Sequence, residues 1–443
     1  MVNHKKPFSR FLRNQILLIG MLLAGDTIFG FFEQNYLNTY LKQVLNLAPL
    51  YISLMVGLSA TVGLIANVVW GIVSDNTRGK FGRRRPYLLL GIISGISMIL
   101  FSFSINIAGG NIITAYIICI ILDVIIIGIT SNAYYVSERA LVPDTVELEK
   151  RGRANGLVQM MGYIGLLLAV ASFLIANLIF GQDIGGETII GQDGHIFTLS
   201  VGGISITTAS IVGFLLIKEK STNELPLKKK FFTDLREIFN ITKFRENKEF
   251  FKIVLALTVF RTGISTIMPF LFIWIYALGV STIELLLTVI VSFSILFIVT
   301  SILGKLADKH GRRRFIPLSI IIISIGIFFL PFVNINSNTN LVLVLILFPF
   351  ALIGLLGLET PMNAWSQDLL PEHERGKFLG LLNIIRTISQ IIGSFVGGLI
   401  ATYMIIQGFI PESFIFMFAP IFFIASIPLF LRVRETLGTI KTR

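Results

Sequence analysis

The sequence is poor in the residues that soluble proteins use for disulfides, metal sites and charged surfaces. Of its 443 residues, one is cysteine, four are histidine and 14% are charged, whereas 54% are hydrophobic. A single cysteine excludes a disulfide framework and a cysteine-based metal site. A soluble protein of this length would carry a charge on about a quarter of its residues. The composition therefore excludes an ordinary soluble protein and indicates a polytopic membrane protein.

Long hydrophobic runs account for most of the chain. A bilayer core of roughly 30 Å is crossed by about 20 residues of helix. The first run is too long for a signal peptide and carries Asp26 and Glu33, so we expect it to be retained. Runs of the required length are expected at residues 15–39, 51–74, 86–106, 112–136, 155–179, 197–217, 251–277, 282–304, 315–334, 340–364, 378–404 and 412–431.

The basic residues predict how these runs are oriented. With the N-terminus inside, all of the 37 lysines and arginines fall in cytoplasmic segments except Lys42, Arg261 and Arg386. Because cytoplasmic loops are enriched in basic residues, this distribution predicts a multi-pass protein of the cell membrane with both termini in the cytoplasm. The net charge of +12 is thus a topology signal. It does not indicate nucleic-acid binding, which would need a basic face on a soluble module.

Two stretches of the sequence repeat in the same order. Gly71 and Asp75 precede a loop that ends in Gly-Arg-Arg-Arg, and so do Gly304 and Asp308, at a spacing of 233 residues for both pairs. A second echo relates residues 141–156 to residues 370–380. Internal repeats of this kind are typical of transporters. The sequence predicts an all-α membrane protein of twelve transmembrane helices in two pseudo-symmetric six-helix bundles, residues 1–217 and 251–443, joined by a cytoplasmic linker at 218–250.

The doubled loop resembles the signature of the major facilitator superfamily. The longer stretch from Ser74 to Tyr87, with Gly25-Asp26 in the first run and Leu141-Val142-Pro143 after the fourth, is similar to the glycoside-pentoside-hexuronide:cation symporters, which include melibiose-type symporters, and to sucrose transporters. This resemblance implies a monomeric secondary transporter that moves a sugar or glycoside by alternating access, without a cofactor. Its expected partners are that substrate, a coupling ion and the lipid bilayer.

The loop residues suit a contact that forms in one state and breaks in another. A carboxylate at a helix end can pair with loop arginines or with the N-terminus of a neighbouring helix. The alternative is that the arginines only fix the topology. The resemblance implies a gating role for Asp75, Arg78, Gly82, Arg83, Arg84, Asp308, Gly311, Arg312 and Arg313.

Ionisable residues within the runs are candidates for coupling, because each costs about 3 kcal/mol at bilayer depth on insertion scales. Asp26 and Glu33 are seven residues apart and therefore share one helix face. The resemblance implies that Asp26 binds the sugar, and a structural salt bridge with Arg261 is the alternative. The predicted coupling residues are Asp26, Glu33, Asp123 and Glu359.

The remaining polar and aromatic residues in the runs complete the predicted substrate site. Arg386 and Gln390 are one helical turn apart, and the guanidinium could bind a carboxylate or neutralise Glu359. An organic anion or hexuronate carrier that uses Arg261 and Arg386 is the first alternative function, and a non-transporting membrane sensor is the second. The predicted substrate-binding residues are Asp26, Gly30, Tyr135, Arg261, Trp365, Arg386 and Gln390.

Two departures from the resemblance bear on the coupling ion. Melibiose-type symporters bind their cation with paired acids in helix 2, and the stretch 63–71 has no acid here; Ile391 stands where they carry a lysine. These departures favour a proton over sodium. The sequence has no Ser-His-Asp set, metal-ligand spacing or phosphate loop, so we do not expect an enzyme. We expect His195 to be solvated in a flexible external loop at 178–196.

Overall fold

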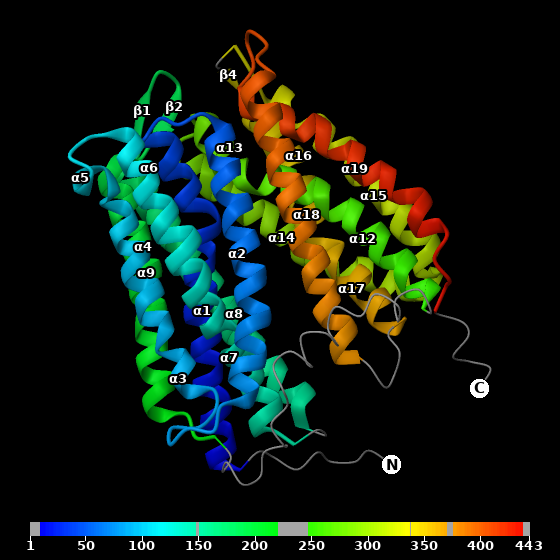
Figure 1. Ribbon diagram of the computed structural model, residues 1–443. Coiled ribbons are helices and arrows are strands. Elements are labelled where there is room, and N and C mark those ends of the chain that lie inside the picture. Colours follow the sequence, from blue (N-terminus) through cyan, green and yellow to red (C-terminus); the bar gives the residue numbers. More distant parts are fainter. Residues whose placement is uncertain (1–8, 148–149, 220–246, 337, 370–374, 437–443) are drawn as a thin grey trace. The chain divides into compact units, whose positions relative to one another are not determined.

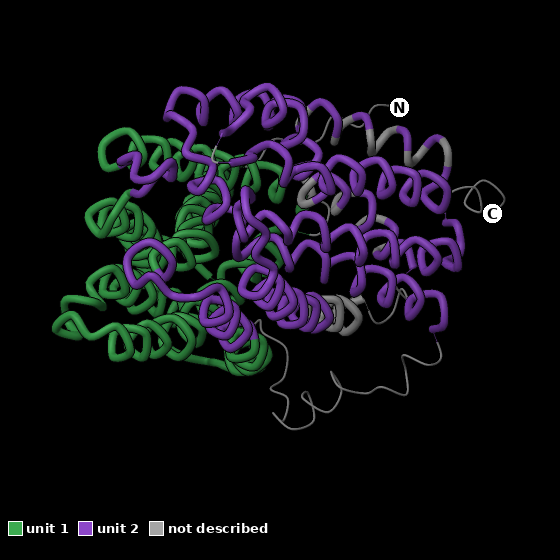
Figure 2. The backbone as a smooth tube through the Cα atoms, turned by 90° about the horizontal axis from the view of Figure 1, so that it is seen from above, with its two compact units in different colours: residues 1–40, 61–180, 190–235 green, residues 41–60, 181–189, 236–443 purple. Residues whose placement is uncertain are grey.

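The computed structural model describes residues 9–147, 150–219, 247–336, 338–369 and 375–436, so most of the predicted linker lies outside the described residues. Contacts group the chain into two compact units (Figure 2). Unit 1 comprises residues 1–40, 61–180 and 190–235, and unit 2 comprises residues 41–60, 181–189 and 236–443. The two units are described separately below.

Helices that run alongside one another build unit 1 (Figure 1). Two of its helices, α1 and α2, begin or end in unit 2, because residues 41–60 belong there. The elements are α1 (Arg10–Gln43), α2 (Pro49–Asn76), α3 (Arg85–Leu88), α4 (Leu90–Ser102), α5 (Ser104–Ile107), α6 (Ile112–Ile120), η1 (Ile121–Ile127), α7 (Gly128–Thr145), α8 (Arg151–Phe180) and α9 (Gly191–Leu216).

The C-terminal elements of unit 2 repeat this pattern of long helices with short breaks. They are α12 (Lys248–Ile267), η4 (Met268–Phe270), α13 (Leu271–Ala277), α14 (Thr282–His310), α15 (Arg312–Phe328), η5 (Leu330–Val333), α16 (Leu341–Leu352), η6 (Ile353–Gly357), α17 (Glu359–Asp368), α18 (Arg375–Tyr403), η7 (Pro411–Phe414) and α19 (Ile415–Leu431). Two short antiparallel hairpins complete the unit. They are β1 (Gln182–Ile184) with β2 (Glu187–Ile189), and β3 (Asn334–Ile335) with β4 (Asn338–Thr339).

The described residues contain ten helices that are long and apolar enough to cross a membrane, and two shorter apolar helices, Thr282–Leu296 and Leu341–Leu352. These twelve segments coincide with the twelve runs expected from the sequence. The all-helical, multi-span fold class is therefore confirmed. The division into two six-helix bundles at residues 217 and 251 stays a prediction.

Small residues let neighbouring helices approach closely in each unit. In unit 1, a Cβ at Gly95 of α4 or at Gly203 of α9 would collide with the backbone carbonyl of the other glycine. In unit 2, a Cβ at Gly393 of α18 would collide with the carbonyl of Thr262 on α12. Helix pairs in membranes pack through such small residues because lipid provides little hydrophobic driving force.

The fourth helical segment of each half has a matching start and a matching break. Asn111 caps the segment that begins at α6, and Asn340 caps the segment that begins at α16, each through a side-chain acceptor for a backbone N–H. Each segment then contains one π-helical stretch, η1 at Ile121–Ile127 and η6 at Ile353–Gly357. Such stretches are rare and are frequently found at functional sites.

Two expectations were wrong in detail. His195 is fully buried on α9, where Nδ1 lies 2.6 Å from the carbonyl oxygen of Gly191 and Nε2 lies 3.1 Å from Oγ1 of Thr39. The expected flexible loop at 178–196 is mostly regular structure, because residues 182–189 form a hairpin and α9 begins at Gly191. The segment expected to end at residue 136 continues as helix to Thr145, which brings Glu138 and Arg139 into it.

Candidate functional site

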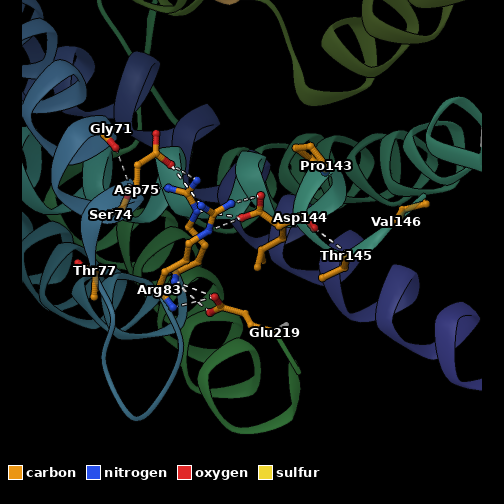
Figure 3. A network of polar contacts seen from close by, with 12 residues as sticks. Gly71, Ser74, Asp75, Thr77, Arg83, Pro143, Asp144, Thr145, Val146 and Glu219 are labelled. Atoms are coloured by element: carbon orange, nitrogen blue, oxygen red, sulfur yellow. Dashed lines mark hydrogen bonds and ion pairs between the residues drawn. The ribbon is translucent and has the colours of Figure 1, made fainter. Parts of the chain in front are cut away.

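A network of polar contacts holds the loop between α2 and α3 in unit 1 (Figure 3). Gly82 has a φ of +94°, a conformation that residues with a Cβ adopt only with strain. A Cβ at this position would also lie 2.8 Å from the carboxylate of Glu219. The glycine of the sequence motif is therefore required both by its backbone angle and by the close approach of a carboxylate.

Two arginines of this loop join α2 to the end of α7. Arg84 donates through Nε to Asp144 at 3.1 Å and through Nη1 to the Ser74 hydroxyl at 2.5 Å, and its Nη2 pairs with Asp75. Arg83 donates through Nε to Asp144 at 3.1 Å, pairs with that carboxylate through Nη2, and reaches Asp75 at 4.0 Å. Both guanidiniums are mostly buried, so these contacts are less screened by solvent than an ordinary surface ion pair.

Glu219, which follows α9, binds the backbone of the same loop. Its carboxylate accepts the backbone N–H groups of Arg83 at 2.8 Å, Arg84 at 3.0 and 3.1 Å, and Arg85 at 2.7 Å. These are donors at the N-terminus of α3, which have no partner within the helix. Sequence reasoning missed Glu219 and Asp144, since neither belongs to the loop motif.

Arg78 differs from its two neighbours. Its guanidinium donates to the backbone carbonyl oxygens of Asp75 at 2.7 Å and Thr77 at 2.8 Å. It therefore stabilises the turn at the end of α2. The structure brings together Asp75, Gly82, Arg83 and Arg84 of the predicted gating set with Asp144 and Glu219, as expected for residues that act as one unit.

Unit 2 repeats this arrangement with fewer contacts among the described side chains. Gly311 has a φ of +88°, and a Cβ there would lie 2.9 Å from Oε2 of Glu435. Glu435 accepts the backbone N–H of Arg313 at 2.8 Å, while Arg312 pairs with Asp368 at 2.6 Å. Arg313 also donates its Nε to the carbonyl of Leu431 at 2.7 Å. The side chain of Asp308 lies outside the described residues.

Within the spans of unit 1, α1 contributes the predicted acids Asp26 and Glu33. Both are partly exposed, and Gly30 between them faces open space, with only the amide of Gln34 within 4.0 Å of a Cβ placed there. Asp123, which lies in η1, is 4% exposed. The charges of Asp26 and Asp123 both act on Glu33. The three predicted coupling acids of unit 1 therefore share one electrostatic neighbourhood.

The end of α7 adds side chains that the sequence reasoning placed outside the membrane. The guanidinium of Arg139 lies over the ring of Tyr135, 4.0 Å from the ring centroid, as in a cation–π contact. Its charge acts on Asp26 and on Glu138. Tyr135 was a predicted substrate residue, and its ring is half-buried beneath this guanidinium. Asp26 thus has a basic neighbour within unit 1.

In unit 2, the basic residues lie on the packed pair α12 and α18. Arg261 of α12 is 5% exposed, whereas Arg386 and Gln390 of α18 are exposed. Ser389, next to Gln390, donates to the carbonyl of Thr258 on α12 at 3.0 Å, which fixes the two helices against each other. The predicted pair between Asp26 and Arg261 would join residues of different units and stays a prediction.

The structure does not place the side chains of two other predicted residues, Trp365 and Glu359, in the substrate site. Trp365 is fully buried, stacks on Phe430 and donates its indole N–H to the carbonyl of Arg434 at 3.1 Å. We therefore leave Trp365 out of the proposed substrate site. The side chain of Glu359, the first residue of α17, lies outside the described residues. No group of three His, Cys, Asp or Glu residues in the described ranges is arranged to hold a metal ion.

Comparisons with known proteins agree on the family. The model of the Major Facilitator Superfamily matches residues 16–394. The chain is 24% identical over 198 residues to Solute carrier family 45 member 4 of Mus musculus, which covers 42% of this chain and 25% of that protein. It is 32% identical over 100 residues to Sucrose transport protein SUT5 of Oryza sativa subsp. indica, covering 22% of this chain and 19% of that protein. The matches thus span a quarter or less of these relatives.

Solved structures resemble the chain over nearly its full length. A D-xylose-proton symporter superposes with a TM-score of 0.68 at 16% identity, covering 97% of this chain and 98% of that one. The inward-open xylose transporter XylE from E. coli gives 0.63 at 16% identity, over 96% and 97%. The nucleoside transporter NupG gives 0.60 at 12% identity, over 95% and 99%. At these identities the likeness shows the fold.

The family match and the shared fold confirm the predicted transporter architecture and the expectation that the chain is not an enzyme. The narrower glycoside-pentoside-hexuronide resemblance stays a prediction. From its repeated loops, its membrane-spanning helices and the match over residues 16–394, the chain belongs to the major facilitator superfamily of transporters, as a multi-pass membrane protein.

Proposed function

We propose that this protein moves a sugar or glycoside across the cell membrane by alternating access, coupled to a proton. We further propose that it works as a monomer with both termini in the cytoplasm, built from bundles at residues 1–217 and 251–443, and that it is related to the glycoside-pentoside-hexuronide symporters. The observation that carries the coupling proposal is the group of acids in the spans of unit 1: Asp26, Glu33 and Asp123.

The chemistry of these acids supports a proton as the coupling ion. Several carboxylates that repel one another at bilayer depth are costly, and binding a proton removes one of the charges. Asp123 also lies on a π-helical stretch, where the ordinary backbone hydrogen-bond pattern is interrupted. Glu359 of α17 follows the matching stretch in unit 2 and completes the proposed coupling set.

The proposal of a sugar rests on the open face of α1 and on the identities of the similar proteins. A carboxylate accepts two neighbouring hydroxyl groups, which suits a polyol. Asp26 and Glu33 flank Gly30, whose missing side chain leaves space for a ring to approach the helix. The similar proteins include a D-xylose-proton symporter and a sucrose transport protein.

We assign a gating role to the two loop networks. In unit 1 the network links α2, α7 and the chain after α9 through Arg83, Arg84 and Glu219. These charge-assisted bonds stabilise the conformation in which they form. When the helices move, water replaces them, and the other conformation lacks this stabilisation. Asp308, Gly311, Arg312 and Arg313 take the corresponding role in unit 2.

Uptake into proteoliposomes tests this function. The wild-type protein is expected to accumulate a labelled glycoside only when an inward proton gradient is imposed, and Asp26→Asn is expected to abolish accumulation. Gln34→Ala, on the same helix, serves as the control that leaves the acids in place. If uptake of every glycoside tested is indifferent both to the gradient and to Asp26→Asn, the proposed substrate and coupling are both wrong.

An organic anion or hexuronate is the second candidate substrate. It is favoured by the two arginines on the packed helices α12 and α18, with Gln390 beside Arg386. An arginine binds a carboxylate through two parallel hydrogen bonds. Competition by uronates that exceeds competition by neutral sugars, and that is lost in Arg261→Gln and Arg386→Gln, would establish this alternative in place of the neutral sugar.

A further inference from the structure

The acid Glu138 on α7 is buried and unpaired. Its side chain is 2% exposed, and Oε2 makes no hydrogen bond to any described residue. The described ion pairs of this region all involve other carboxylates, those of Asp75 and Asp144. A buried carboxylate without a partner costs several kcal/mol, and such groups persist in proteins when they are neutral, paired or functional.

Neighbouring residues fix the direction in which this part of α7 faces. Tyr134, one helical turn before Glu138, donates its hydroxyl to the carbonyl of Leu22 on α1 at 3.0 Å. A Cβ at Gly91 of α4 would lie 2.8 Å from the ring of Tyr134. Residues four apart on a helix share a face, so Glu138 lies on the side of α7 that packs toward α1, and the charge of Asp26 acts on it.

The basic residue next to Glu138 is engaged elsewhere. Arg139 is exposed and stacks over the ring of Tyr135, while its charge still acts on Glu138. α4 has no titratable side chain in Leu90–Ser102. The titratable groups on α7 itself and on the other elements near it are Arg10, Arg13, Asp26, Glu33, Tyr36, Tyr40 and Lys42 (α1), Tyr51 and Asp75 (α2), Arg85 and Tyr87 (α3), Asp123 (η1), Tyr134, Tyr135, Arg139 and Asp144 (α7), and Arg151, Arg153 and Tyr163 (α8).

Most of these groups already have a hydrogen-bond, ion-pair or ring partner. Arg85 donates to the carbonyl of Phe214 at 2.8 Å, Tyr87 shares a hydrogen bond with Thr77 at 2.5 Å, and Arg151 donates to the carbonyls of Pro143 and Val146. The groups whose charges act on Glu138 are Asp26, a like charge, and Arg139. Glu138 is thus under the influence of two charges of opposite sign, the acid proposed to bind substrate and the arginine next to it in the chain.

We propose that Glu138 is a proton-binding site of the transport cycle, occupied in this conformation and coupled to Asp26. Binding adds one proton to the carboxylate and removes one negative charge beside Asp26; release leaves a carboxylate and hands the proton to water. In this proposal the side chain of Glu138 is a neutral carboxylic acid, and its Oε2 has no hydrogen-bond partner among the described residues. This inference rests on the proposed proton coupling and adds to it a residue that the sequence reasoning had placed outside the membrane.

The substitution Glu138→Gln tests this proposal because it replaces the acid by a neutral group of the same shape. Accumulation driven by a proton gradient is expected to fall at least ten-fold, while exchange of substrate across the membrane without a gradient is retained. Ser137→Ala is the matched control, since Ser137 is also buried and its hydroxyl has no partner among the described residues. It is expected to leave both activities unchanged. Accumulation that survives in Glu138→Gln would overturn the proposal.

A measurement that needs no substrate separates this proposal from the proposed function. Infrared difference spectra of the purified protein at neutral pH are expected to show a protonated carboxylic acid C=O band that disappears in Glu138→Gln and persists in Ser137→Ala. Its presence supports the site even if no sugar is accumulated. A wild-type spectrum whose acid bands do not depend on Glu138 overturns the site even if proton-driven uptake is observed. Should Glu138→Gln fail to fold, Glu138→Asp is expected to keep the band with a shifted frequency, and an unshifted band would contradict the assignment.

Discussion

The two loops that carry the repeated motif are alike, whereas the spans beside them differ. In both units a glycine at positive φ lies against a glutamate that follows the last helix of its half, Glu219 or Glu435. In both units a loop arginine pairs with an aspartate at the end of the fourth helical segment, Asp144 or Asp368. The two repeats thus share the glycine–glutamate and arginine–aspartate contacts at the helix ends.

The spans have not kept the same charges. Unit 1 holds the acids of α1, η1 and α7, whereas the described ionisable residues inside the unit 2 pair α12 and α18 include the arginines Arg261 and Arg386. We assign the contacts shared by both units to the proposed gating. We assign the acids that only unit 1 carries to the proposed binding of substrate and proton.

The largest effect is expected from the acids that only unit 1 carries. Glu33→Gln removes the acid on which the charges of both Asp26 and Asp123 act. Proton-driven accumulation is expected to fall at least ten-fold, or about 1.4 kcal/mol in coupling free energy. Gln34→Ala is the control on the same helix. Uptake of labelled substrate at several imposed gradients measures the loss, and a full gradient response in Glu33→Gln would contradict the special role of unit 1.

The next effect compares the two loops directly. Arg84→Ala removes bonds to Ser74, Asp75 and Asp144 and is expected to cost about 2 kcal/mol of stability, since charge-assisted bonds of mostly buried groups are lost. Arg312→Ala, which breaks the described pair with Asp368, is expected to cost a similar amount, because the Arg312 side chain is also mostly buried.

Thermal unfolding in detergent and the initial rate of uptake measure both changes. Arg84→Lys and Arg312→Lys keep the charge but lose the planar fork, so partial recovery is expected in each. A loss in Arg84→Ala with no loss in Arg312→Ala would contradict the likeness of the two loops.

The loop glycines are expected to behave alike, because their geometry is alike. Gly82→Ala and Gly311→Ala each force a Cβ to positive φ, at a cost of roughly 1–2 kcal/mol, and push against a glutamate. Gly79→Ala is the control in the same loop, since a Cβ there meets only the Gly82 carbonyl at 3.7 Å. Lower unfolding temperatures for the first two variants and not for the third are expected. A neutral Gly82→Ala would contradict the strain argument.

The smallest effect lies away from both loops, in the hairpin of unit 2. Partial burial of this otherwise exposed side chain, and then the nearby Glu412 carboxylate, raise the pKa of Glu187 above its ordinary value of 4.5. Because the folded protein holds this proton more tightly than the unfolded chain, stability contributed by the group is lost as the pH rises above that value.

Glu187→Gln is therefore expected to raise the unfolding temperature at neutral pH, by on the order of 1 °C for an exposed side chain, and to leave it unchanged at acid pH. Unfolding scans at the two pH values measure this, with the exposed Asp193→Asn as the control. A change of the same size at both pH values would assign the effect to something other than the proton.

The sequence was sufficient for the spans, the repeat and the loop motif, because each rests on a local pattern of hydropathy or charge. It was insufficient where a partner is distant in the chain. Glu219 and Asp144 carry no motif, yet they meet Arg83 across 136 and 61 residues. His195 was misjudged because a glycine-rich stretch reads as loop, whereas the residues before it pair as a hairpin.

Glu138 was missed for another reason. Hydropathy falls where polar residues begin, so the expected span stopped at residue 136, although backbone hydrogen bonding carries the helix to Thr145. The π-helical stretches η1 and η6 have no signature in hydropathy at all, since their apolar residues read as ordinary span. Only their matching positions in the two repeats reveal that the breaks belong to the fold.

Proton movement upon addition of sugar tests the central claim most directly. Proteoliposomes in a weakly buffered medium, without any imposed gradient, are expected to alkalinise that medium when a transported glycoside is added. Asp26→Asn is expected to abolish the signal, and Ser137→Ala to retain it. Entry of labelled glycoside without any accompanying proton uptake by the wild-type protein would contradict the account.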